Sequence, residues 1–528
     1  MSVKVLDCTL RDGGYVNNFA FGEDSAKKII SGLVDSGLEY VEVGFFRNAK
    51  SDTETTVFTS FYDVEHLLPN TKNNSKYFAM IVYGTFDIDK IPMKSQTKID
   101  GIRVTFKKKE IDEALAYIKK IQEKGYIVSA NPTGVHQYAD NELLTLIGKI
   151  NQYNPDIFAI VDTLGLLKSD ELLRIFYLVN HNLNESITIA FHSHNNLQLS
   201  FSNAQALLAS NTKRELIIDA SVRGMGRGAG NLCTELLLQY LNDNFDKKYN
   251  LIPILKIIDE QIDKIYATNP WGYNVPYYLA ASMKCHPNYA SFLTDKASIS
   301  VESMSEILAL IPENKKSNYD EKLIQELYLC YQENEINDTH ALENLKNNVA
   351  NRDVLIIAPG KSINLYKDKI LSYIKEKKPY VISINFRPEA FDIDNVFISN
   401  ARRFSEQTSF ENVLVTSNIK AENVITFNYG SYLNNSEMAD NSCLMLLKIL
   451  LKAGIKKVIF AGMDGFSNGN DNYFNVSMIN NAKLGEFDKR NEVMSQMLKS
   501  LAKSINMTFL TPSLYEKEHE VQSFSVGY

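Results

Sequence analysis

The sequence predicts an α/β protein that begins with a (β/α)₈ TIM barrel, continues through a helical appendage and ends in a Rossmann-like open α/β domain. Two observations predict the barrel: eight apolar runs begin 24 to 37 residues apart, and amphipathic stretches lie between them. This spacing suits repeated strand, loop and helix units, and eight such units in about 250 residues are typical of a closed barrel. The length of 528 residues leaves room for a second domain.

The eight predicted barrel strands share apolar residues at nearly every position, as expected of parallel strands that are buried on both faces. Helices are predicted between them, for example over Ser25–Ser36 and over Asp112–Lys124, where Gly125 follows as a C-terminal cap. A doubly wound sheet is the alternative, but eight consecutive units without a clear reversal favour the barrel. The predicted strands are Lys4–Leu10, Tyr40–Phe45, Tyr77–Tyr83, Gly101–Phe106, Tyr126–Pro132, Ile157–Thr163, Thr188–His194 and Ile217–Val222.

The second half of the chain changes character twice. Helical patterns such as Pro276–Cys285 replace the strands first, and a new α/β pattern begins at Asp353. We therefore divide the chain into a barrel at 1–260, an appendage and linker at 261–348, and a Rossmann-like domain at 349–528. The strands of this last domain are predicted at six short apolar runs, namely VLII, YVISINF, NVFISN, VLVTSN, VITFNYG and KKVIFAG.

Composition excludes several classes of protein. The net charge is −7, from 56 basic and 63 acidic residues, so no basic excess indicates nucleic acid or an anionic membrane as a partner. No apolar run reaches the ~18 residues that a membrane span needs, and the N-terminus lacks the basic start and apolar stretch of a secretory signal. The five cysteines form no CxxC pair. We therefore expect a cytoplasmic protein.

The densest polar sequence lies at the ends of the first and seventh predicted strands, where a barrel keeps its active site. The first strand is followed by Asp12, and the seventh ends in His192 and His194. Strand alternation directs the two histidines to the same side, as two ligands of one metal ion require. One carboxylate and two imidazoles suit Mn²⁺, Mg²⁺, Co²⁺ or Zn²⁺. The alternative is that the two histidines are ordinary core or loop residues.

Arg11 precedes the candidate metal ligand Asp12 in the sequence. A guanidinium beside a metal site stabilises negative charge that develops on a substrate oxygen, such as that of an enolate. A structural salt bridge is the alternative role for Arg11.

Three motifs carry a resemblance to a known family. These are DCTLRDGG at Asp7–Gly14, HSHNNLQLS at His192–Ser200 and DASVRGMGRGAGN at Asp219–Asn231, with VEVG and VDTLG as further matches. Over roughly residues 1–260 the sequence resembles the metal-dependent pyruvate aldolases of the 4-hydroxy-2-oxovalerate aldolase type. That group belongs to a superfamily with 3-hydroxy-3-methylglutaryl-CoA lyase and the isopropylmalate and homocitrate synthases.

The resemblance implies a ligand set and a reaction. Asp12, His192 and His194 would hold the divalent ion, Mn²⁺ in the first place, and Asn231 would be an additional ligand. Arg11 would stabilise a pyruvate enolate, and a 4-hydroxy-2-oxo acid would be cleaved to a 2-oxo acid and an aldehyde, or formed from them. The resemblance also implies a homo-oligomer.

One position departs from the family. Where the aldolases carry a histidine three residues after the metal aspartate, thought to be the base on the 4-hydroxyl, this chain has Tyr15. A tyrosine phenol is a much weaker base than an imidazole near neutral pH. Tyr273 and His286, in the predicted appendage, are the other candidates, because related aldolases supply a tyrosine from that region. Packing is the alternative role for both.

The second α/β domain opens with a strand and the loop Ala358–Ser362 (APGKS), which offers backbone donors to a phosphate. A P-loop is excluded, because Leu355 occupies the position of its first glycine. The domain is weakly similar to family 42 sialyltransferases, although their first loop glycine is Ala358 here. This resemblance implies a nucleotide or nucleotide sugar as a partner, held near Gly360, Ser362 and Asp464. A scaffold domain without a ligand is the alternative.

Three functions remain open at this point. The first is a metal-dependent aldolase or lyase, whose fusion to a sugar-type domain would fit surface-glycan or sugar-acid biosynthesis. The second is an acyl-CoA-dependent Claisen synthase on the same barrel. The third is a bifunctional protein, or mainly a nucleotide-sugar transferase, with a degenerate barrel. The intact set of Asp12, His192 and His194 argues against the third.

Overall fold

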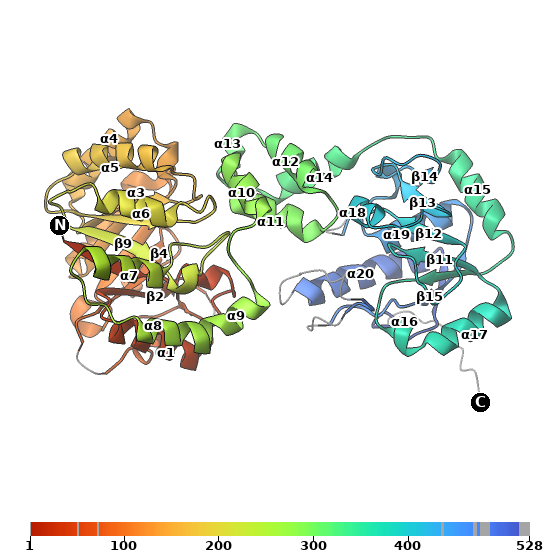
Figure 1. Cartoon of the computed structure of the whole chain (residues 1–528), viewed down its shortest axis with the longest axis horizontal. Coiled ribbons are helices and arrows are strands. Elements are labelled where there is room, and N and C mark those ends of the chain that lie inside the picture. Colours follow the sequence, from red (N-terminus) through yellow and green to blue (C-terminus); the bar gives the residue numbers. More distant parts are fainter. Residues whose placement is uncertain are drawn as a thin grey trace. The chain divides into compact units, whose positions relative to one another are not determined.

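The computed structural model describes residues 2–49, 52–70, 73–434, 438–467, 472–475 and 486–516 of the chain. The chain divides into two compact units (Figure 1). Unit 1 comprises Met1–Ala290 and Pro312–Tyr319, and unit 2 comprises Ser291–Ile311 and Asp320–Tyr528. Each unit is built around its own parallel sheet.

The sheet of unit 1 closes into a barrel of eight parallel strands, because the first strand pairs with both the second and the last. A two-residue strand, β3 (Val57–Phe58), adds to the side of β2. The predicted (β/α)₈ barrel is therefore confirmed. Its strands are β1 (Val3–Asp7), β2 (Tyr40–Phe46), β4 (Lys76–Val82), β5 (Gly101–Phe106), β6 (Ile127–Pro132), β7 (Ile157–Asp162), β8 (Thr188–Ser193) and β9 (Leu216–Ala220).

The barrel helices bury one stripe each against the strands. In α3, buried Ala114, Leu115, Ile118 and Ile121 recur at helical spacing. Gly125, with φ of +90°, then lets the chain turn back toward β6. The helices of the barrel are α1 (Glu23–Asp35), α2 (Tyr62–Glu65), α3 (Ile111–Glu123), α4 (Asp140–Tyr153), α5 (Ser169–Asn182), α6 (Ser200–Leu208), α7 (Thr234–Asn244) and α8 (Ile252–Ile257).

The inside of the barrel has an apolar layer and a polar layer. The apolar cluster includes Leu6, Phe78 and Ile217, which fill the space between the strands. Two residues further along β9, Asp219 points to the same side as Ile217, and it meets Arg103 of β5 there. The buried polar side chains therefore gather toward the carboxyl ends of the strands, where the loops carry the candidate site.

The helical segment that lies between β9 and β10 in the sequence is divided between the two units. We predicted an appendage and linker over 261–348, but α12, α14 and α15 fall in unit 2, and the division passes through α11. The physical reason is packing, since Leu345 and Val349 of α15 join the core beneath the second sheet. The segment contains α9 (Asp263–Thr268), α10 (Val275–Ser282), α11 (Pro287–Lys296), α12 (Val301–Ala309), α13 (Glu313–Lys316), α14 (Glu321–Gln332) and α15 (Thr339–Val349).

The sheet of unit 2 has seven parallel strands in the order β14-β13-β12-β11-β10-β15-β16. The six predicted runs all form strands. The last strand, β16, was missed, because its sequence NMTF is short and half polar. The strands are β10 (Val354–Ile357), β11 (Tyr380–Ile384), β12 (Asn395–Ile398), β13 (Val413–Thr416), β14 (Ile425–Phe427), β15 (Lys457–Ala461) and β16 (Asn506–Phe509).

Helices cover both faces of this second sheet (Figure 1). The core on one face includes residues of α15, α19 and α20, and the core on the other includes Ile363 of α16 and Ile370 of α17. The order of the strands reverses between β10 and β15, which are neighbours although about 100 residues separate them. The helices are α16 (Ser362–Leu365), α17 (Lys367–Lys377), α18 (Ala401–Ser405), α19 (Ser442–Lys452) and α20 (Glu486–Ala502).

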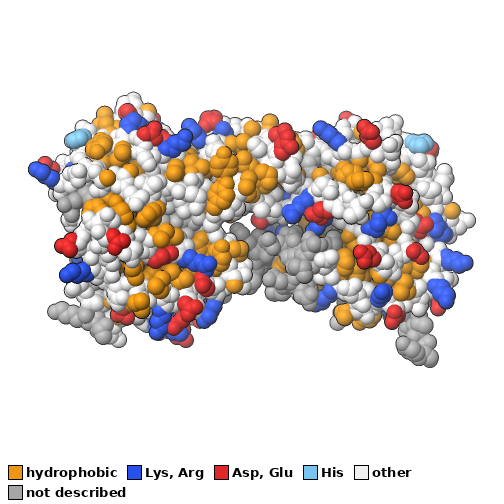
Figure 2. Space-filling view, in the orientation of Figure 1, with side chains coloured by type: hydrophobic (Ala, Val, Ile, Leu, Met, Phe, Trp, Pro, Cys, Tyr) orange, Lys and Arg blue, Asp and Glu red, His pale blue; other side chains and the backbone are white. Residues whose placement is uncertain are grey.

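The surface carries mixed charge. On the face drawn in Figure 2, acidic and basic side chains are interspersed on each unit. None of the helices in the described part of the chain combines the length and the hydropathy needed to cross a membrane.

Candidate metal centre

A tight turn after β1 positions Asp12. The backbone N–H groups of Arg11 and Asp12 both donate to the carbonyl of Cys8, at 3.1 and 2.8 Å. Side chains fix this turn to the rest of the barrel: Thr9 Oγ1 accepts from the N–H of Val222, and Asp7 accepts from Thr234 Oγ1 at 2.6 Å. The aspartate is therefore held by a loop that the barrel core orders.

Asp12, His192 and His194 come together at the carboxyl ends of the strands. All three side chains are buried, and each offers a ligand atom within 4.8 Å of the other two. His192 lies on β8, and His194 lies just beyond its end, next to Asn231, with which it forms an isolated bridge. The three residues that the sequence predicted as metal ligands are thus assembled.

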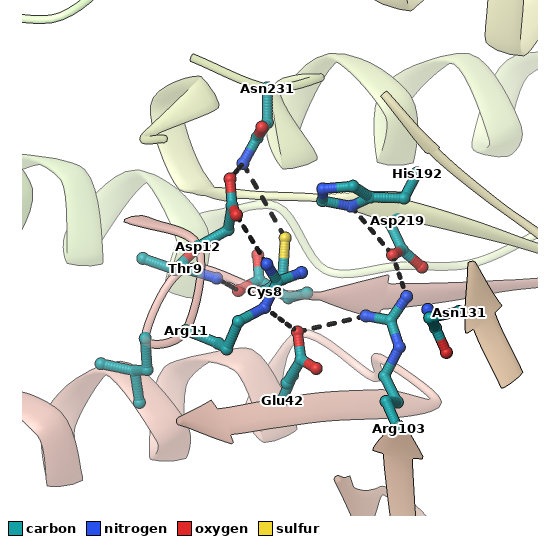
Figure 3. Close-up of polar contacts among 12 residues, drawn as sticks. Cys8, Thr9, Arg11, Asp12, Glu42, Arg103, Asn131, His192, Asp219 and Asn231 are labelled. Atoms are coloured by element: carbon teal, nitrogen blue, oxygen red, sulfur yellow. Dashed lines mark hydrogen bonds and ion pairs between the residues drawn. The ribbon is translucent and has the colours of Figure 1, made fainter. Parts of the chain in front are cut away.

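Asp219 fixes the orientation of His192 (Figure 3). The Nδ1 atom of His192 lies 3.0 Å from Asp219 Oδ2, which also accepts from Arg103 Nη2. With Nδ1 bonded to a carboxylate, Nε2 is the nitrogen that His192 has left for a ligand. This hydrogen bond is the usual support of a metal-binding histidine.

The glycine-rich loop after β9 delivers Asn231. Its Nδ2 donates to Asp12 Oδ2 at 2.7 Å, as Figure 3 shows, and its Oδ1 is buried without a hydrogen-bond partner. A Cβ at Gly226 would lie 2.5 Å from the Asn231 amide, so only glycine lets the loop fold over this side chain. Asn196 supports the same loop by accepting from the N–H of Ala229.

Arg11 links the metal-ligand candidates to a buried charge network. Its Nη1 donates to Asp12 at 2.6 Å and its Nε to Glu42 at 2.7 Å, while its Nη2 is buried without a partner. Glu42 also accepts from Arg103, which continues to Asp219 (Figure 3). A chain of ion pairs therefore runs from Arg11 to the partner of His192.

The pKa values follow from burial and from this network. Burial alone would raise the pKa of Asp12, but Arg11, with His194 and His192, holds it well below its ordinary value. Burial lowers the pKa of His194 to about 3, although Asp12 opposes the shift. Asp12 is therefore a carboxylate and His194 a neutral imidazole near neutral pH, which are the ligand forms that a metal binds.

The residues present fit a divalent cation. The two buried arginines and the three buried carboxylates of the network (Asp12, Glu42, Asp219) leave one net negative charge in the interior. Two buried atoms that can bind a cation, His194 Nδ1 and Asn231 Oδ1, have no hydrogen-bond partner. A cation among these atoms would satisfy both and offset the excess charge. The mixed nitrogen and oxygen donors suit Mn²⁺, Mg²⁺, Co²⁺ or Zn²⁺.

The three candidates for proton transfer lie in different surroundings. Tyr15 is 37% exposed, and the Arg227 guanidinium lies 5.6 Å from its ring centre. Tyr273 is 57% exposed. Trp271 takes the buried position in the same segment, and its Nε1 donates to the carbonyl of Arg223.

His286 is the third candidate for proton transfer. Burial lowers its pKa to about 3, and Arg227 and His194 add to the shift, so the imidazole lies within electrostatic range of both side chains. Its Nδ1 accepts from the N–H of Asn288 at 3.1 Å. The neutral ring therefore carries its proton on Nε2.

Two residues of this site had no role assigned from the sequence. Asp219 stood inside a quoted motif, and alternation along β9 would have directed it into the barrel with Ile217. Arg227 lies in the glycine-rich loop, where the sequence carries no signal that its charge reaches Asp12 and His194.

The predicted nucleotide residues of unit 2 lie at the end of β10 and β15, but their donors are already used. Asp464 accepts from the N–H of Ser362 at 2.8 Å and from its hydroxyl. The N–H of Gly360 donates to the carbonyl of Gly462 at 2.9 Å. The loop is therefore closed by Asp464 in this structure, and the donors of Gly360 and Ser362 are not presented to a phosphate.

Replacement of Asp219 by Asn is expected to weaken metal binding by roughly 10- to 100-fold, because the carboxylate that orients His192 is lost. Titration of Mn²⁺ followed by the electron paramagnetic resonance of the free ion measures the change. The same substitution at exposed Asp243 is the control and should leave the affinity unaltered. Unchanged Mn²⁺ affinity in Asp219→Asn would contradict the positioning role.

The barrel part of the chain is similar in sequence to known proteins. The HMGL-like family model matches residues 2–259. A 4-hydroxy-2-oxovalerate aldolase of Geobacillus genomosp. 3 is 24% identical over 243 residues, which are 46% of this chain and 71% of the relative. The enzyme of the same name from Pseudoalteromonas translucida is 26% identical over 242 residues, 46% of this chain and 70% of the relative.

Two further matches extend the comparison. An oxaloacetate decarboxylase of Mycobacterium tuberculosis is 24% identical over 245 residues, 45% of this chain and 69% of the relative. Among solved structures, the N-terminal domain of a Bacteroides vulgatus protein has a TM-score of 0.49 at 28% identity, covering 58% of this chain and 100% of that domain.

The barrel, its Asp-His-His cluster and these relatives define a class: this is a metal-dependent aldolase or lyase that acts on carbon–carbon bonds. Within that class, residues 2–259 of this chain are similar to the HMGL-like family. The similarity of the C-terminal domain to sialyltransferases stays a prediction.

Proposed function

We propose that the barrel cleaves or forms a 4-hydroxy-2-oxo acid through a pyruvate enolate, with a 2-oxo acid and an aldehyde as the reaction partners. The observation that carries the proposal is the assembly of Asp12, His192 and His194 within 4.8 Å of one another, with Arg11 bound to Asp12. The names of the relatives, 4-hydroxy-2-oxovalerate aldolase, support the choice of substrate.

The metal ligands in this proposal are Asp12, His192, His194 and Asn231. A divalent cation, with Mn²⁺ as the first choice, would supply Lewis acidity toward the carboxylate and keto oxygens of the 2-oxo acid. The protein holds Asp12 as a carboxylate through Arg11 and holds His192 through Asp219. These contacts keep the ligand atoms oriented before substrate arrives.

Arg11 is the proposed stabiliser of the enolate. Its Nη2 is buried and has no acceptor, so one N–H group remains for a substrate oxygen. Burial opposes the charge of Arg11, but Glu42 and Asp12 hold its pKa well above the ordinary value. The guanidinium therefore stays charged and fixed while negative charge develops on the oxygen beside it.

We assign to Tyr15 and His286 the proton transfer and hydrogen bonding at the C4 oxygen of the substrate. The Nε2–H of neutral His286 can donate a hydrogen bond to this oxygen as the C3–C4 bond breaks or forms. In the synthetic direction the Tyr15 hydroxyl gives its proton to the C4 oxygen and becomes a phenolate, which regains a proton from solvent; in cleavage the Tyr15 phenolate takes the proton of the 4-hydroxyl. The electrostatic proximity of His286 to His194 and Arg227 supports this assignment. Tyr273, more than half exposed, is the weaker of the candidates.

Substituting Tyr15→Phe or His286→Leu is expected to slow cleavage of 4-hydroxy-2-oxo acids by roughly 10²-fold or more, because each removes a polar hydrogen near the C4 oxygen. Exchange of the C3 protons of pyruvate, followed by NMR in deuterium oxide, should persist, since that step needs no group on C4. His286→Gln keeps an N–H donor and should recover part of the rate. Equal losses of cleavage and exchange would contradict the assignment.

The aldolase proposal is tested by pyruvate release from a panel of 4-hydroxy-2-oxo acids and sugar-derived analogues, with and without Mn²⁺. Formation of pyruvate that depends on the metal supports the proposal. Absence of both pyruvate release and metal-dependent proton exchange at pyruvate C3 would overturn it. The same panel identifies the aldehyde partner.

A Claisen synthase on the same barrel is the second candidate. It would release CoA thiol from an acyl-CoA and a 2-oxo acid, and it would release no pyruvate from hydroxy-oxo acids. The relatives named as aldolases favour the first candidate. A homo-oligomer, a cytoplasmic location, a role in surface-glycan or sugar-acid biosynthesis and a nucleotide-sugar transferase activity of the second domain all stay predictions.

A further inference from the structure

Unit 2 has a cavity of about 490 Å³ outside the carboxyl ends of its parallel strands. The ends of β10, β11, β12 and β15 all contribute to its wall, as do α18, α19 and α20. The strand order reverses between β10 and β15, and ligands of open parallel sheets bind at such a reversal. The volume suits a small molecule of nucleotide or sugar-phosphate size.

The loop after β10 closes one side of this cavity rather than opening it to an anion. Asp464 occupies the N–H and hydroxyl of Ser362, and a Cβ at Gly360 would lie 2.3 Å from the carbonyl of Gly462. The Asp464 carboxylate would also repel a phosphate at this position. An anionic group must therefore bind elsewhere in the cavity.

Basic side chains of two helices also line the cavity. They are Arg403 of α18, whose Nη1 donates to Glu406 at 2.8 Å, and Lys489 and Arg490 of α20. Burial raises the pKa of Tyr473, and Arg490 and Arg403 oppose that shift, so both guanidinium groups lie within electrostatic range of the same hydroxyl. Tyr473 itself is held against the β10 loop by a bridge to Gly360. Two guanidinium groups from different helices thus converge, and their planar forks match a phosphate.

Another side of the cavity offers hydrogen-bond acceptors. Asn385, at the end of β11, has a buried Oδ1 without a partner, while its Nδ2 donates to Ser442 Oγ at 2.9 Å. Its backbone has φ of +64°, a conformation that is costly for most residues and that holds the amide at the cavity wall. Three carboxylates also line the cavity, namely Asp295, Glu321 and Asp440. Acceptors of this kind pair with the hydroxyl groups of a sugar.

We propose that this cavity is a second small-molecule site, independent of the barrel, which takes a phosphate ester of a sugar with the phosphate at Arg403 and Arg490 and the hydroxyl groups toward Asn385. A nucleotide and a simple sugar phosphate share this chemistry. The Gly360–Ser362 loop acts as a closed wall in this arrangement, and Asp464 keeps it closed.

The experiment is calorimetric titration of the full-length protein with CMP, glucose 1-phosphate, inorganic phosphate and pyruvate. At least one of the two esters should bind with a dissociation constant below about 1 mM. Arg403→Gln and Arg490→Gln should each weaken that ester by about tenfold or more, because a charge-assisted hydrogen bond is lost. CMP binding alone identifies a nucleotide site, and glucose 1-phosphate binding alone identifies a sugar-phosphate site.

Matched controls separate this site from the barrel. Arg402→Gln changes the neighbouring arginine on α18, whose side chain is 61% exposed and which is not among the cavity-lining residues, and it should leave binding unaltered. Asp12→Asn should also leave ester binding unaltered, and both cavity variants should keep the barrel activity and the thermal unfolding of the wild type. Asn385→Gly, which tolerates the positive φ, should weaken the ester but not inorganic phosphate.

Three results would overturn the proposal. The first is that neither ester binds at about 5 mM, a concentration that detects even weak sites. The second is that both arginine variants bind the ester as tightly as the wild type does. The third is that inorganic phosphate or pyruvate binds at least as tightly as the esters, which would show that the site does not recognise a sugar.

Discussion

Replacement of Asp12 by Asn is expected to lower metal affinity and turnover each by roughly 10³-fold or more, because a direct carboxylate ligand is lost from the site. The amide keeps one acceptor oxygen, so the substitution also costs either Arg11 Nη1 or Asn231 Nδ2 its acceptor. The buried network then carries no net negative charge to offset a cation. Turnover is measured as pyruvate formation, and affinity as Mn²⁺ binding to the full-length protein.

The control for Asp12→Asn is Asp89→Asn, an exposed aspartate on the barrel surface, which should behave as the wild type does. Thermal unfolding separates loss of the metal from loss of the fold, since the apo wild type is the proper reference for the variant. Turnover and Mn²⁺ affinity within threefold of the wild type would contradict the assignment of Asp12 as a ligand.

Replacement of Arg103 by Met is expected to destabilise unit 1 by roughly 3–5 kcal/mol, the cost of leaving buried charges without their partner. Arg103 is 1% exposed and bridges Glu42 of β2 and Asp219 of β9, the two strands that flank β1. Without it Glu42 keeps only Arg11 as a partner, and Asp219 keeps only His192, while both carboxylates stay buried. Differential scanning calorimetry of the full-length protein measures the shift of the transition that belongs to unit 1.

The matched control is Arg174→Met, because Arg174 forms an ion pair whose two side chains are 49% and 61% exposed. Exposed pairs contribute about 1 kcal/mol or less, so the control should barely move the transition. Arg103→Lys keeps the charge without the fork and should give an intermediate loss. A loss in Arg103→Met no larger than that of the control would show that the two carboxylates do not depend on Arg103.

The barrel was predictable because its signal is local and repeated. Each strand is a continuous apolar run, and each intervening helix buries a stripe at fixed spacing, as α3 does. The seventh strand of the second sheet was not predictable in this way, because only its place beside β15 makes NMTF a strand. How the helical segment packs is not visible in the sequence for the same reason, since Leu345 and Val349 of α15 pack against distant strands.

The clustering of Asp12, His192 and His194 was predictable because alternation along β8 gives the two histidines one direction, and because the end of β1 lies at the same end of the barrel. The surroundings of a site are harder to predict. The contact of Asp219 with His192 joins two strands, and the closure of the Ser362 loop by Asp464 spans about 100 residues. Sequence motifs named the right loops but not the partners that occupy their donors.

The short return of the chain into unit 1 at Pro312–Tyr319 has a consequence for genetic dissection of this protein. In that segment the carbonyls of Lys315 and Asn318 accept from the Tyr289 hydroxyl. The carbonyl of Lys316 accepts from the N–H of His286 at 2.7 Å. A gene fragment that ends at residue 290 would encode every metal-ligand candidate and His286, but it would omit the segment that accepts the N–H of His286. Such a fragment should still catalyse exchange of the C3 protons of pyruvate but should not cleave a 4-hydroxy-2-oxo acid.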